Sequence, residues 1–373
     1  MRTKAALARE IGKLTIEEIE LDPPKKHEVL VRMQAAGVCH SDLHTYRGEL
    51  RAMPPLVLGH EGAGIVEQVG ESVTRVRPGD RVMVNWIPAC ETCPTCLSGR
   101  YNLCERLPAT TFQALLPDGT SRLHTLDGLT LKHYLSVATM SEYAVLHEAS
   151  AIPIPDDVPF EVAAIVGCAV VTGVGAVLNT AQARAGRPAA VIGCGGIGLS
   201  AIQGCRLVGC HPIVAVDVLE SKLAFARQMG ATHTVNAREQ DPVEALQALT
   251  GRGPEYVFDS VGSAGTIAQA LQAARPGGTA VIIGLAAARA EVAIPAGALV
   301  MGNRRLLGSF VGSMQPRLDL PMLIELYRAG KLDLDVLISK RYRLEELPQA
   351  FEDMEQGKVA RGVLVFGSPH STL

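Results

Sequence analysis

Four cysteines close together in the chain carry the strongest chemical signal in the sequence. Two residues separate Cys90 from Cys93 and Cys93 from Cys96, and a seven-residue loop leads on to Cys104. Thiolates at this spacing can surround one ion and complete the tetrahedral shell of a structural zinc site. The alternative, four incidental or buried cysteines, fits so regular a spacing poorly. The sequence therefore predicts a closed zinc site with these four ligands.

A second metal site has to be assembled from scattered residues. Catalytic zinc needs three protein ligands and an open position, and the candidates are Cys39, His60 and Cys168. Each is weak alone, because a lone cysteine is more often a small core residue and a lone histidine is more often simply hydrogen-bonded. Asp42 and Glu61 are carboxylates near these residues that can orient the ligands and tune the metal, and we include Glu61 in the predicted site.

A glycine-rich turn is the third signal. Gly193, Gly195, Gly196 and Gly198 lie between an expected strand and an expected helix, where they allow a pyrophosphate to approach the helix N-terminus. Asp217 follows 19 residues after Gly198, at the end of the next strand. A carboxylate there binds the ribose hydroxyls of NAD and repels the 2′-phosphate of NADP. We predict NAD, although a plain turn and a solvated aspartate are the alternatives.

The elements around the glycine turn alternate between strand and helix. This βαβ pattern predicts an open, doubly wound parallel sheet. The expected strands are 189–192, 212–216, 256–259 and 279–284, and the expected helices are 199–208, 221–229 and 264–274.

The two ends of the chain have a different pattern. Short β-rich runs at 28–33, 64–69 and 81–84 alternate with Gly/Pro turns and predict a β-rich barrel with loops. Amphipathic helices at 320–329 and 344–356 precede a last strand at 362–366, and we expect this segment to rejoin the first domain. Residues 117–130 read as an unusually long loop. The predicted fold class is α/β with two domains.

Composition limits the function classes. A chain of 373 residues exceeds one core, and a net charge of -3 gives no field for gathering nucleic acid. The uncharged run 162–183 is long enough to span a membrane, but Gly167, Gly173 and Gly175 interrupt it, so we expect buried core. Nine cysteines, an odd number, fit reduced thiols and metal sites, and charges at residues 9 and 10 disfavour export. We therefore expect a cytoplasmic protein.

These motifs together resemble the zinc-containing alcohol dehydrogenases of the medium-chain dehydrogenase/reductase family over essentially the whole chain. The resemblance implies a GroES-like catalytic domain, residues 1–169 and 311–373, and a Rossmann NAD-binding domain, residues 170–310. It is carried by Gly37–Asp42, Gly59–Gly64, the four-cysteine loop, Gly167–Cys168 with Thr172–Gly173, the glycine turn with Val216–Asp217, and Gly357–Arg361.

The resemblance also implies how the reaction proceeds. Cys39, His60 and Cys168 match the catalytic zinc ligands, Ser41 matches a hydroxyl relay, and His44 matches the surface base that releases the proton through the cofactor ribose. Zinc would stabilise the alkoxide of a primary alcohol, Ser41 would take its proton, and the nicotinamide would accept a hydride. As alternatives, Ser41 could cap a helix and His44 could be a solvated side chain.

Further positions are assigned by the resemblance alone. His40 and Arg361 match contacts to the pyrophosphate, Lys222 matches a contact to the adenosine ribose, and Thr172 and Ile197 match contacts to the nicotinamide. Each of them could instead be an ordinary surface or core residue.

The expected substrate pocket is large and mostly apolar, which favours aromatic or medium-chain alcohols. Core packing is the alternative, above all for Leu285 and Phe310. The segment 108–136 resembles the longer loop of dimeric members and implies a homodimer. The pocket residues are Leu50, Trp86, Tyr134, Leu285 and Phe310.

Two other functions compete with a plain alcohol substrate. The Cys39-His40 pair also resembles the thiol-adduct formaldehyde dehydrogenases, but Pro108 stands where those using glutathione have an arginine, although Arg106 is close. His44 also replaces their tyrosine, so we rank the S-hydroxymethyl thiol substrate second. A zinc-free, quinone-reductase-like protein is the third possibility, and the retained zinc ligands argue against it.

Overall fold

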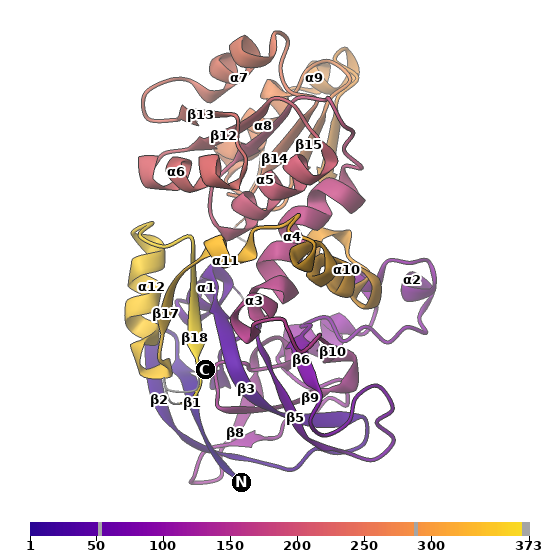
Figure 1. Cartoon of the computed structure of the whole chain (residues 1–373), viewed down its shortest axis with the longest axis vertical. Coiled ribbons are helices and arrows are strands. Elements are labelled where there is room, and N and C mark those ends of the chain that lie inside the picture. Colours follow the sequence, from indigo (N-terminus) through magenta and orange to yellow (C-terminus); the bar gives the residue numbers. More distant parts are fainter. Residues whose placement is uncertain (51–53, 287–289, 368–373) are drawn as a thin grey trace. The chain divides into compact units, whose positions relative to one another are not determined.

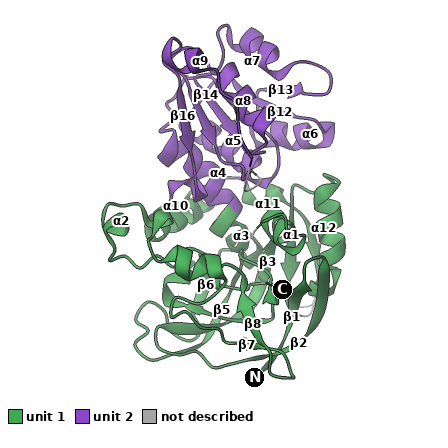
Figure 2. Cartoon of the chain, turned by 180° about the vertical axis from the view of Figure 1, so that it is seen from behind, with its two compact units in different colours: residues 1–168, 315–328, 334–373 green, residues 169–314, 329–333 purple. Residues whose placement is uncertain are grey.

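The computed structural model describes residues 1–50, 54–286 and 290–367, which divide into two compact units (Figure 2). Unit 1 comprises Met1–Cys168, Gln315–Arg328 and the C-terminal segment from Leu334. Unit 2 comprises Ala169–Met314 and Ala329–Asp333. The predicted α/β fold class with two domains is confirmed, because unit 1 contains a closed barrel and a largely antiparallel sheet and unit 2 contains a parallel sheet.

Unit 1 contains a closed five-stranded barrel (Figure 1). Strand β1 pairs antiparallel with both β2 and β4, and the short strands β7 and β8 close the ring. Apolar side chains such as Leu7, Ile19 and Leu131 are buried in its core. The strands are β1 (Arg2–Glu10), β2 (Lys13–Leu21), β4 (Leu56–Val57), β7 (Leu123–His124) and β8 (Thr130–His133).

A seven-stranded sheet forms the rest of the unit 1 scaffold. Strand β18 pairs antiparallel with β3, so the C-terminal segment rejoins the first part of the chain, as predicted. Strand β9 also pairs with β3, and the remaining order is β10-β6-β5-β3-β18-β17. The strands are β3 (Glu28–Val38), β5 (Ala63–Val69), β6 (Arg81–Val84), β9 (Tyr143–His147), β10 (Ala151–Pro153), β17 (Ile338–Tyr342) and β18 (Arg361–Val365).

The helices of unit 1 are mostly short. Helix α12 buries Leu347, Ala350, Phe351 and Met354 in one core, and this spacing places them on a single helix face. The helices are α1 (His40–Tyr46), α2 (Pro94–Leu97), α3 (Phe160–Ile165), α10 (Pro316–Arg328), α11 (Leu334–Leu337) and α12 (Leu347–Glu355).

Unit 2 is built on a six-stranded parallel sheet with the order β13-β12-β11-β14-β15-β16. The order runs outward from β11 in both directions, so right-handed crossovers place helices on both faces of the sheet. Ligands of such sheets bind beyond the carboxyl ends of the strands where the order reverses. The strands are β11 (Ala189–Ile192), β12 (Ile213–Asp217), β13 (His233–Asn236), β14 (Tyr256–Asp259), β15 (Thr279–Ile282) and β16 (Arg305–Gly308).

The helices of unit 2 begin and end at recognisable signals. Asp241 caps α7 by accepting two backbone N–H bonds, and Ser263 and Thr266 form a reciprocal cap on α8. Helix α5 ends at Gly209, whose positive φ of 79° suits glycine. The helices are α4 (Val171–Gly175), α5 (Gly196–Val208), α6 (Glu220–Met229), α7 (Pro242–Thr250), α8 (Ala264–Ala273) and α9 (Ala296–Val300).

The boundaries of unit 2 differ from the predicted 170–310. Its first segment extends to Met314 because the backbone of Gly312 lies close to Gly175; a Cβ on Gly175 would stand 2.6 Å from the Gly312 carbonyl oxygen. Residues Ala329–Asp333 also belong to unit 2. There the Asp333 N–H donates to Gln203 at 2.7 Å, and its carboxylate pairs with Arg206 at 2.6 Å. Neither contact has a signature in the local sequence.

Two further expectations concern apolar and loop segments. Within the helical segment Phe160–Thr180, an 18-residue stretch has a mean hydropathy of 2.1 and is 89% buried within the protein, in agreement with buried core. The long loop expected at 117–130 is wrong in part, because Leu123–His124 forms strand β7 of the barrel. Arg122 beside it is fully buried and pairs with Glu28 at 2.5 Å. A two-residue strand is too short to show a periodic pattern, which is why the sequence does not reveal it.

Candidate metal centres and dinucleotide-binding turn

The four-cysteine loop gathers its sulfurs around one point. Cys90, Cys93, Cys96 and Cys104 offer ligand atoms that all lie within 4.8 Å of one another. Sulfurs around a tetrahedral zinc ion would lie about 3.8 Å apart, given zinc–sulfur bonds of about 2.3 Å. The short helix α2 places two of the ligands, since Cys93 is its N-cap and accepts a hydrogen bond from the Cys96 N–H. The donor set fits a closed zinc site.

Backbone amides stabilise negative charge on these sulfurs. The N–H of Cys90 points to Cys104 Sγ at 3.3 Å, and the N–H of Cys93 points to Cys90 Sγ at 3.3 Å. Burial acts to raise the pKa of Cys90, but hydrogen bonds from Thr92 and Cys93 outweigh it and lower that pKa to about 6. Burial raises the pKa of Cys96. A cation bound by the four sulfurs would neutralise part of their negative charge. All four cysteines could then be thiolates at this short spacing.

The second cluster brings together residues from distant parts of unit 1. Cys39 precedes α1, His60 and Glu61 lie between β4 and β5, and Cys168 is in the helical segment after α3. All four side chains are buried, and their ligand atoms lie within 4.8 Å of one another. The Nε2 atom of His60 and one carboxylate oxygen of Glu61 have no hydrogen-bond partner among the described residues. Buried polar atoms without partners are costly, so a cation fits this site.

The electrostatics of the second cluster also favour a cation. Cys168, as a hydrogen-bonding neighbour, and the His60 imidazole hold the pKa of Cys39 well below its usual value. The pKa of Cys168 is raised, because the two thiols share a proton and burial disfavours a second thiolate. Burial raises the pKa of Glu61 to about 7, although Arg361 opposes the shift. A divalent ion would replace the shared proton and allow both thiolates to form.

Two polar contacts orient the ligands from behind. Asp42 is fully buried; its carboxylate lies 3.1 Å from His60 Nδ1 and accepts the Gly59 N–H at 3.0 Å. This contact directs the Nε2 atom of His60 toward the two cysteines. Glu61 pairs with the buried guanidinium of Arg361. Arg361 is the first residue of β18, and the pairing of β18 with β3 brings it to this site. Arg361 is 5% exposed, and its expected contact with a pyrophosphate stays a prediction.

Two aromatic side chains flank His60 at right angles. The Trp86 and Tyr134 rings lie 6.2 Å and 5.5 Å from the imidazole, respectively. The Tyr134 hydroxyl donates to the carbonyl of Ser41 at 3.1 Å and accepts from Thr45 at 2.9 Å. Tyr134 therefore anchors α1 as well as forming an apolar wall, a role that the sequence analysis did not assign.

Helix α1 carries the predicted proton path. The Ser41 hydroxyl lies 3.7 Å from the Cys39 sulfur, close to the predicted zinc site. His40 is exposed and its ring lies 6.0 Å from that of His44. Leu50 is half-buried and its N–H donates to the carbonyl of His44 at 3.3 Å. The relay roles of Ser41 and His44 stay predictions.

The glycine turn in unit 2 has the form that a phosphate group requires. Gly193 has a φ of 88°, and a Cβ there would stand 2.6 Å from Val261. A Cβ on Gly198 would stand 1.9 Å from the Gly193 carbonyl oxygen, so the helix can begin close to the strand only without one. A Cβ on Gly195 would meet nothing within 4 Å, which leaves open space at the N-terminus of α5. This space suits a pyrophosphate.

The Asp217 carboxylate accepts hydrogen bonds from three backbone N–H groups, which the sequence did not predict. It is 8% exposed, and one carboxylate oxygen accepts the Cys194 N–H at 2.7 Å. The other oxygen accepts the N–H groups of Val218 at 2.7 Å and Leu219 at 3.0 Å. The carboxylate thus braces the glycine turn against β12. A carboxylate has about four acceptor positions, so capacity remains for a ribose hydroxyl.

The remaining predicted residues of unit 2 lie on different elements. Lys222 is half-buried in α6, Thr172 is 6% exposed in α4, and Ile197 is half-buried in the first turn of α5. Leu285 follows β15 and is 65% exposed, and Phe310 follows β16 and is half-buried. Their contacts with a nicotinamide or a substrate stay predictions.

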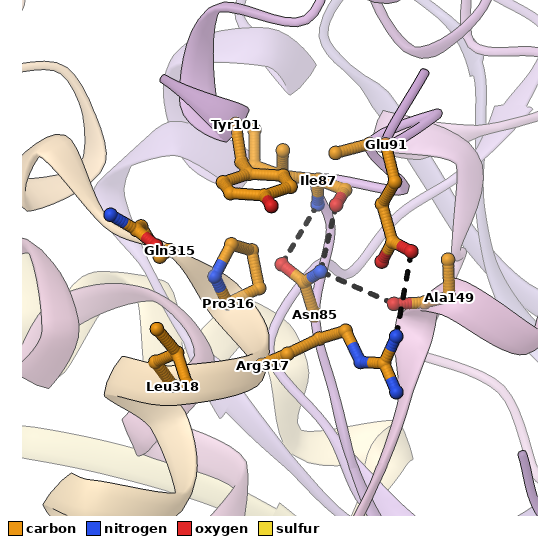
Figure 3. A pocket seen from close by; sticks show the side chains of 10 residues that line it. Asn85, Ile87, Glu91, Tyr101, Ala149, Gln315, Pro316, Arg317 and Leu318 are labelled. Carbon is orange, nitrogen blue, oxygen red and sulfur yellow. Dashed lines mark hydrogen bonds and ion pairs between the residues drawn. The ribbon is translucent and has the colours of Figure 1, made fainter. Parts of the chain in front are cut away.

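A separate cavity of about 260 Å³ lies in unit 1 beside the four-cysteine loop (Figure 3). Its walls come from the segment 85–91, from Tyr101 and from the start of α10. Glu91 forms ion pairs there with Arg75 at 2.9 Å and Arg317 at 3.4 Å. Figure 3 shows Arg317 reaching toward Glu91, while the Asn85 amide is held by the backbone. None of the predicted site residues lines this cavity.

Comparisons with known proteins agree with this geometry. Residues 25–156 match the family described as "Alcohol dehydrogenase GroES-like domain", and residues 196–328 match "Zinc-binding dehydrogenase". The chain is 42% identical to "Alcohol dehydrogenase class-3" of Cereibacter sphaeroides, over 98% of this chain and 100% of that protein. It is 39% identical to "S-(hydroxymethyl)glutathione dehydrogenase" of Paracoccus denitrificans, with the same coverage of 98% and 100%. The crystal structure of benzyl alcohol dehydrogenase from Acinetobacter calcoaceticus has a TM-score of 0.93 at 29% identity, covering 98% of this chain and 100% of that chain.

Proposed function

Since this chain belongs to the zinc-dependent alcohol dehydrogenases of the medium-chain dehydrogenase/reductase family, we propose that it oxidises the hydroxymethyl group of a thiol adduct with NAD. The observation that carries a dehydrogenase function is the buried Cys39, His60 and Cys168 cluster with its unpartnered imidazole nitrogen. The reaction removes a hydride and a proton from the carbinol carbon and its hydroxyl, and the product of the adduct is a thioester.

The residues of the site divide the chemical work. Cys39, His60 and Cys168 would hold a zinc ion, which when bound supplies a Lewis acid that makes an alcohol hydroxyl more acidic. Asp42 fixes the His60 ring from behind, and Trp86 and Tyr134 exclude water from the imidazole. Ser41 lies close enough to the cluster to accept the hydroxyl proton, which His44 then delivers to solvent.

The thiol-adduct substrate now ranks above the plain alcohol that the sequence analysis placed first. Relatives at about 40% identity over nearly their full lengths are named S-(hydroxymethyl)glutathione dehydrogenase. Arg106, two residues after Cys104, is exposed. It can therefore hold a carboxylate of the adduct in place of the arginine that Pro108 replaces.

Aromatic and medium-chain alcohols are the second candidate. His44 replaces the tyrosine of the thiol-adduct enzymes, and the aromatic rings of Trp86 and Tyr134 stand beside His60. The benzyl alcohol dehydrogenase with a TM-score of 0.93 supports this candidate. A substrate without an anionic group would make Arg106 unnecessary.

The preference for NAD is the part of the proposal that depends on Asp217. Its carboxylate lies at the end of β12, where it would repel the 2′-phosphate of NADP. Asp217→Gly would relax this preference, although it would also remove the bond to Cys194. A steady-state comparison of NAD with NADP measures the ratio directly.

A homodimer and a cytoplasmic location are proposed as well. The segment 108–136 resembles the longer loop of dimeric members. In the sheet that the structure describes, β16 is an edge strand that pairs with β15 on one side and has no strand on the other. Val300 and Met301 beside it are 80% and 87% exposed, and an open edge with apolar neighbours favours association. Light scattering would give the mass, and Met301→Glu should weaken the dimer.

The nine free cysteines support a reducing compartment, which fractionation of the source cells would test.

The decisive assay compares substrates with NAD at about pH 8, where proton removal is favoured. Formaldehyde is supplied with and without glutathione, beside benzyl alcohol, hexanol and ethanol. Activity that needs the thiol and falls after chelation supports the proposal, and activity with benzyl alcohol alone supports the second candidate. Arg106→Ala should raise KM for the adduct about tenfold and leave benzyl alcohol unchanged, since one charged hydrogen bond is lost. Arg100→Ala, another exposed arginine of the loop, is the matched control.

A further inference from the structure

A carboxylate contacts the predicted surface base. Glu49 Oε2 forms a hydrogen bond with Nδ1 of His44, and the two side chains are 50% and 43% exposed. An ionised carboxylate only accepts hydrogen bonds, and a neutral imidazole carries a single N–H. The contact therefore assigns the N–H of His44 to Nδ1 and leaves the lone pair on Nε2.

The backbone after α1 holds Glu49 against His44. The chain turns at Gly48, whose φ of 75° suits glycine, and the N–H of Glu49 then donates to the His44 carbonyl at 2.8 Å. A Cβ on Gly48 would stand 2.9 Å from Ile11, so the turn is also packed from the side. Because main chain and side chain of Glu49 both bind His44, the carboxylate needs little further ordering to reach the ring.

The other charged groups near His44 leave this contact intact. Arg47 pairs through both terminal nitrogens with Glu355, so it does not draw Glu49 away. The ring of His40 lies 6.0 Å from that of His44. Arg47 lowers the pKa of Glu355, and the two histidines add to this shift. Within the described part of the chain, Glu49 is the carboxylate that forms a hydrogen bond with His44.

We propose that Glu49 is a positioning residue of the proton path, which holds His44 in the tautomer whose Nε2 accepts the proton. The proposal rests on the proposed function, because it gives His44 the role of final base. It adds a residue that neither the motif resemblance nor the comparisons identify. The mechanism is tautomer control, in which a carboxylate hydrogen bond at one ring nitrogen decides which nitrogen is basic.

Variants of Glu49 separate an acceptor from a charge. Glu49→Gln keeps an oxygen that accepts the Nδ1 proton, so kcat should stay within about twofold of the wild type. Glu49→Leu keeps neither, so kcat should fall about three- to tenfold with little change in KM, as expected for one hydrogen bond. Glu345→Leu removes a carboxylate of 51% exposure from an ion pair with Lys4 and should change nothing.

A double variant tests whether Glu49 acts through His44. In a His44→Gln background, Glu49→Leu should cause no further loss, because residues that act as a unit are not additive. Equal losses in both backgrounds, or equal losses for the Gln and Leu variants, would overturn the proposal.

Nitrogen NMR of the 15N-labelled histidines gives a readout that needs no activity. His44, identified by its absence in His44→Gln, should carry its proton on Nδ1 in the wild type and in Glu49→Gln, and shift toward Nε2–H in Glu49→Leu. An unchanged tautomer in Glu49→Leu contradicts the inference even if the enzyme is inactive on every alcohol tried. Conversely, a shifted tautomer without activity would overturn only the proposed function.

Discussion

The two cysteine-containing clusters of unit 1 solve the same coordination problem in different ways. Cys90, Cys93, Cys96 and Cys104 come from one loop of fifteen residues, and two of the four are only half-buried. Cys39, His60 and Cys168 span well over a hundred residues, and all are buried. The first cluster is held by its own backbone N–H groups, whereas the second depends on β3, β5 and α3 being in place.

A closed metal site can therefore be built from one local segment, whereas an open metal site cannot. Four neighbouring thiolates leave no position for a substrate, and the loop needs little support. A site with three protein ligands keeps an open position and depends on the surrounding fold for its geometry. Removing a ligand of the open site around Cys168 should therefore lower activity, whereas removing a ligand of the closed site around Cys104 should lower stability.

The largest expected effect is on activity. Cys168→Ser should lower kcat/KM about 1,000-fold or more, because a Lewis acid supplies several kcal/mol of transition-state stabilisation. The far-UV circular dichroism spectrum should stay that of the wild type, because the segment around residue 168 is a buried helix. Cys205→Ala, a buried cysteine outside both clusters, is the control and should stay active. Near-normal activity of Cys168→Ser would contradict a catalytic role for this cluster.

The second effect should appear in stability. Cys104→Ser should lower the free energy of unfolding by about 3–4 kcal/mol, the linkage contribution of a zinc ion present at 100–1,000 times its Kd. Urea denaturation measures the loss, and kcat of the protein that stays folded should change less than threefold. Ser98→Ala in the same loop is the control. An inactive but fully stable variant would contradict the structural role.

The buried pair behind the second cluster should give a somewhat smaller loss. Arg361→Met leaves the Glu61 carboxylate buried without its partner and should cost about 3 kcal/mol in urea denaturation. Glu61→Met combined with Arg361→Met should recover part of this loss, because no unpaired charge then remains. Equal stability of the single and double variants would show that the pair carries no charge in the folded protein.

A second buried histidine provides the smallest effect and a reference for His60. His133 is fully buried and its Nε2 accepts the Arg122 N–H at 3.1 Å; burial, aided by the Arg122 guanidinium, lowers the pKa of His133 to about 3. Below pH 6.5 the unfolded chain binds a proton that the folded chain does not, so stability falls as the pH falls toward 3.

The expected loss is about 2 kcal/mol between pH 7 and pH 5, at about 1.4 kcal/mol per pH unit. Urea denaturation at both pH values should show this loss, and His133→Gln should reduce it. The exposed His233, as His233→Gln, is the control and should leave the pH dependence unchanged. A wild-type stability that is flat from pH 7 to 5 would contradict the assignment.

Local patterns predicted several elements of the fold to within a residue or two. Strands 81–84, 189–192 and 256–259 have the predicted bounds, because each is a short apolar run between turn residues. The two-residue strands β4 and β7 could not be predicted, since they are too short for a period of two to show. Their pairing depends on barrel closure, which is a tertiary property.

The candidate sites show the same limit. Spacing alone proposed the four-cysteine site, whereas the Cys39, His60 and Cys168 site needed a family resemblance, because nothing local connects a cysteine in an apolar helix with a distant histidine. The bond from Asp217 to the Cys194 N–H and that from Tyr134 to the Ser41 carbonyl have no sequence signature. Such contacts bridge elements that meet only after folding.

The zinc content of the purified, active chain shows whether both clusters of ligands hold a metal ion. We expect plasma mass spectrometry to find two zinc ions per chain, one for each cluster of ligands, and a single zinc ion in each of the variants Cys104→Ser and Cys168→Ser. A folded, active wild type with a single zinc ion, or with none, would contradict it.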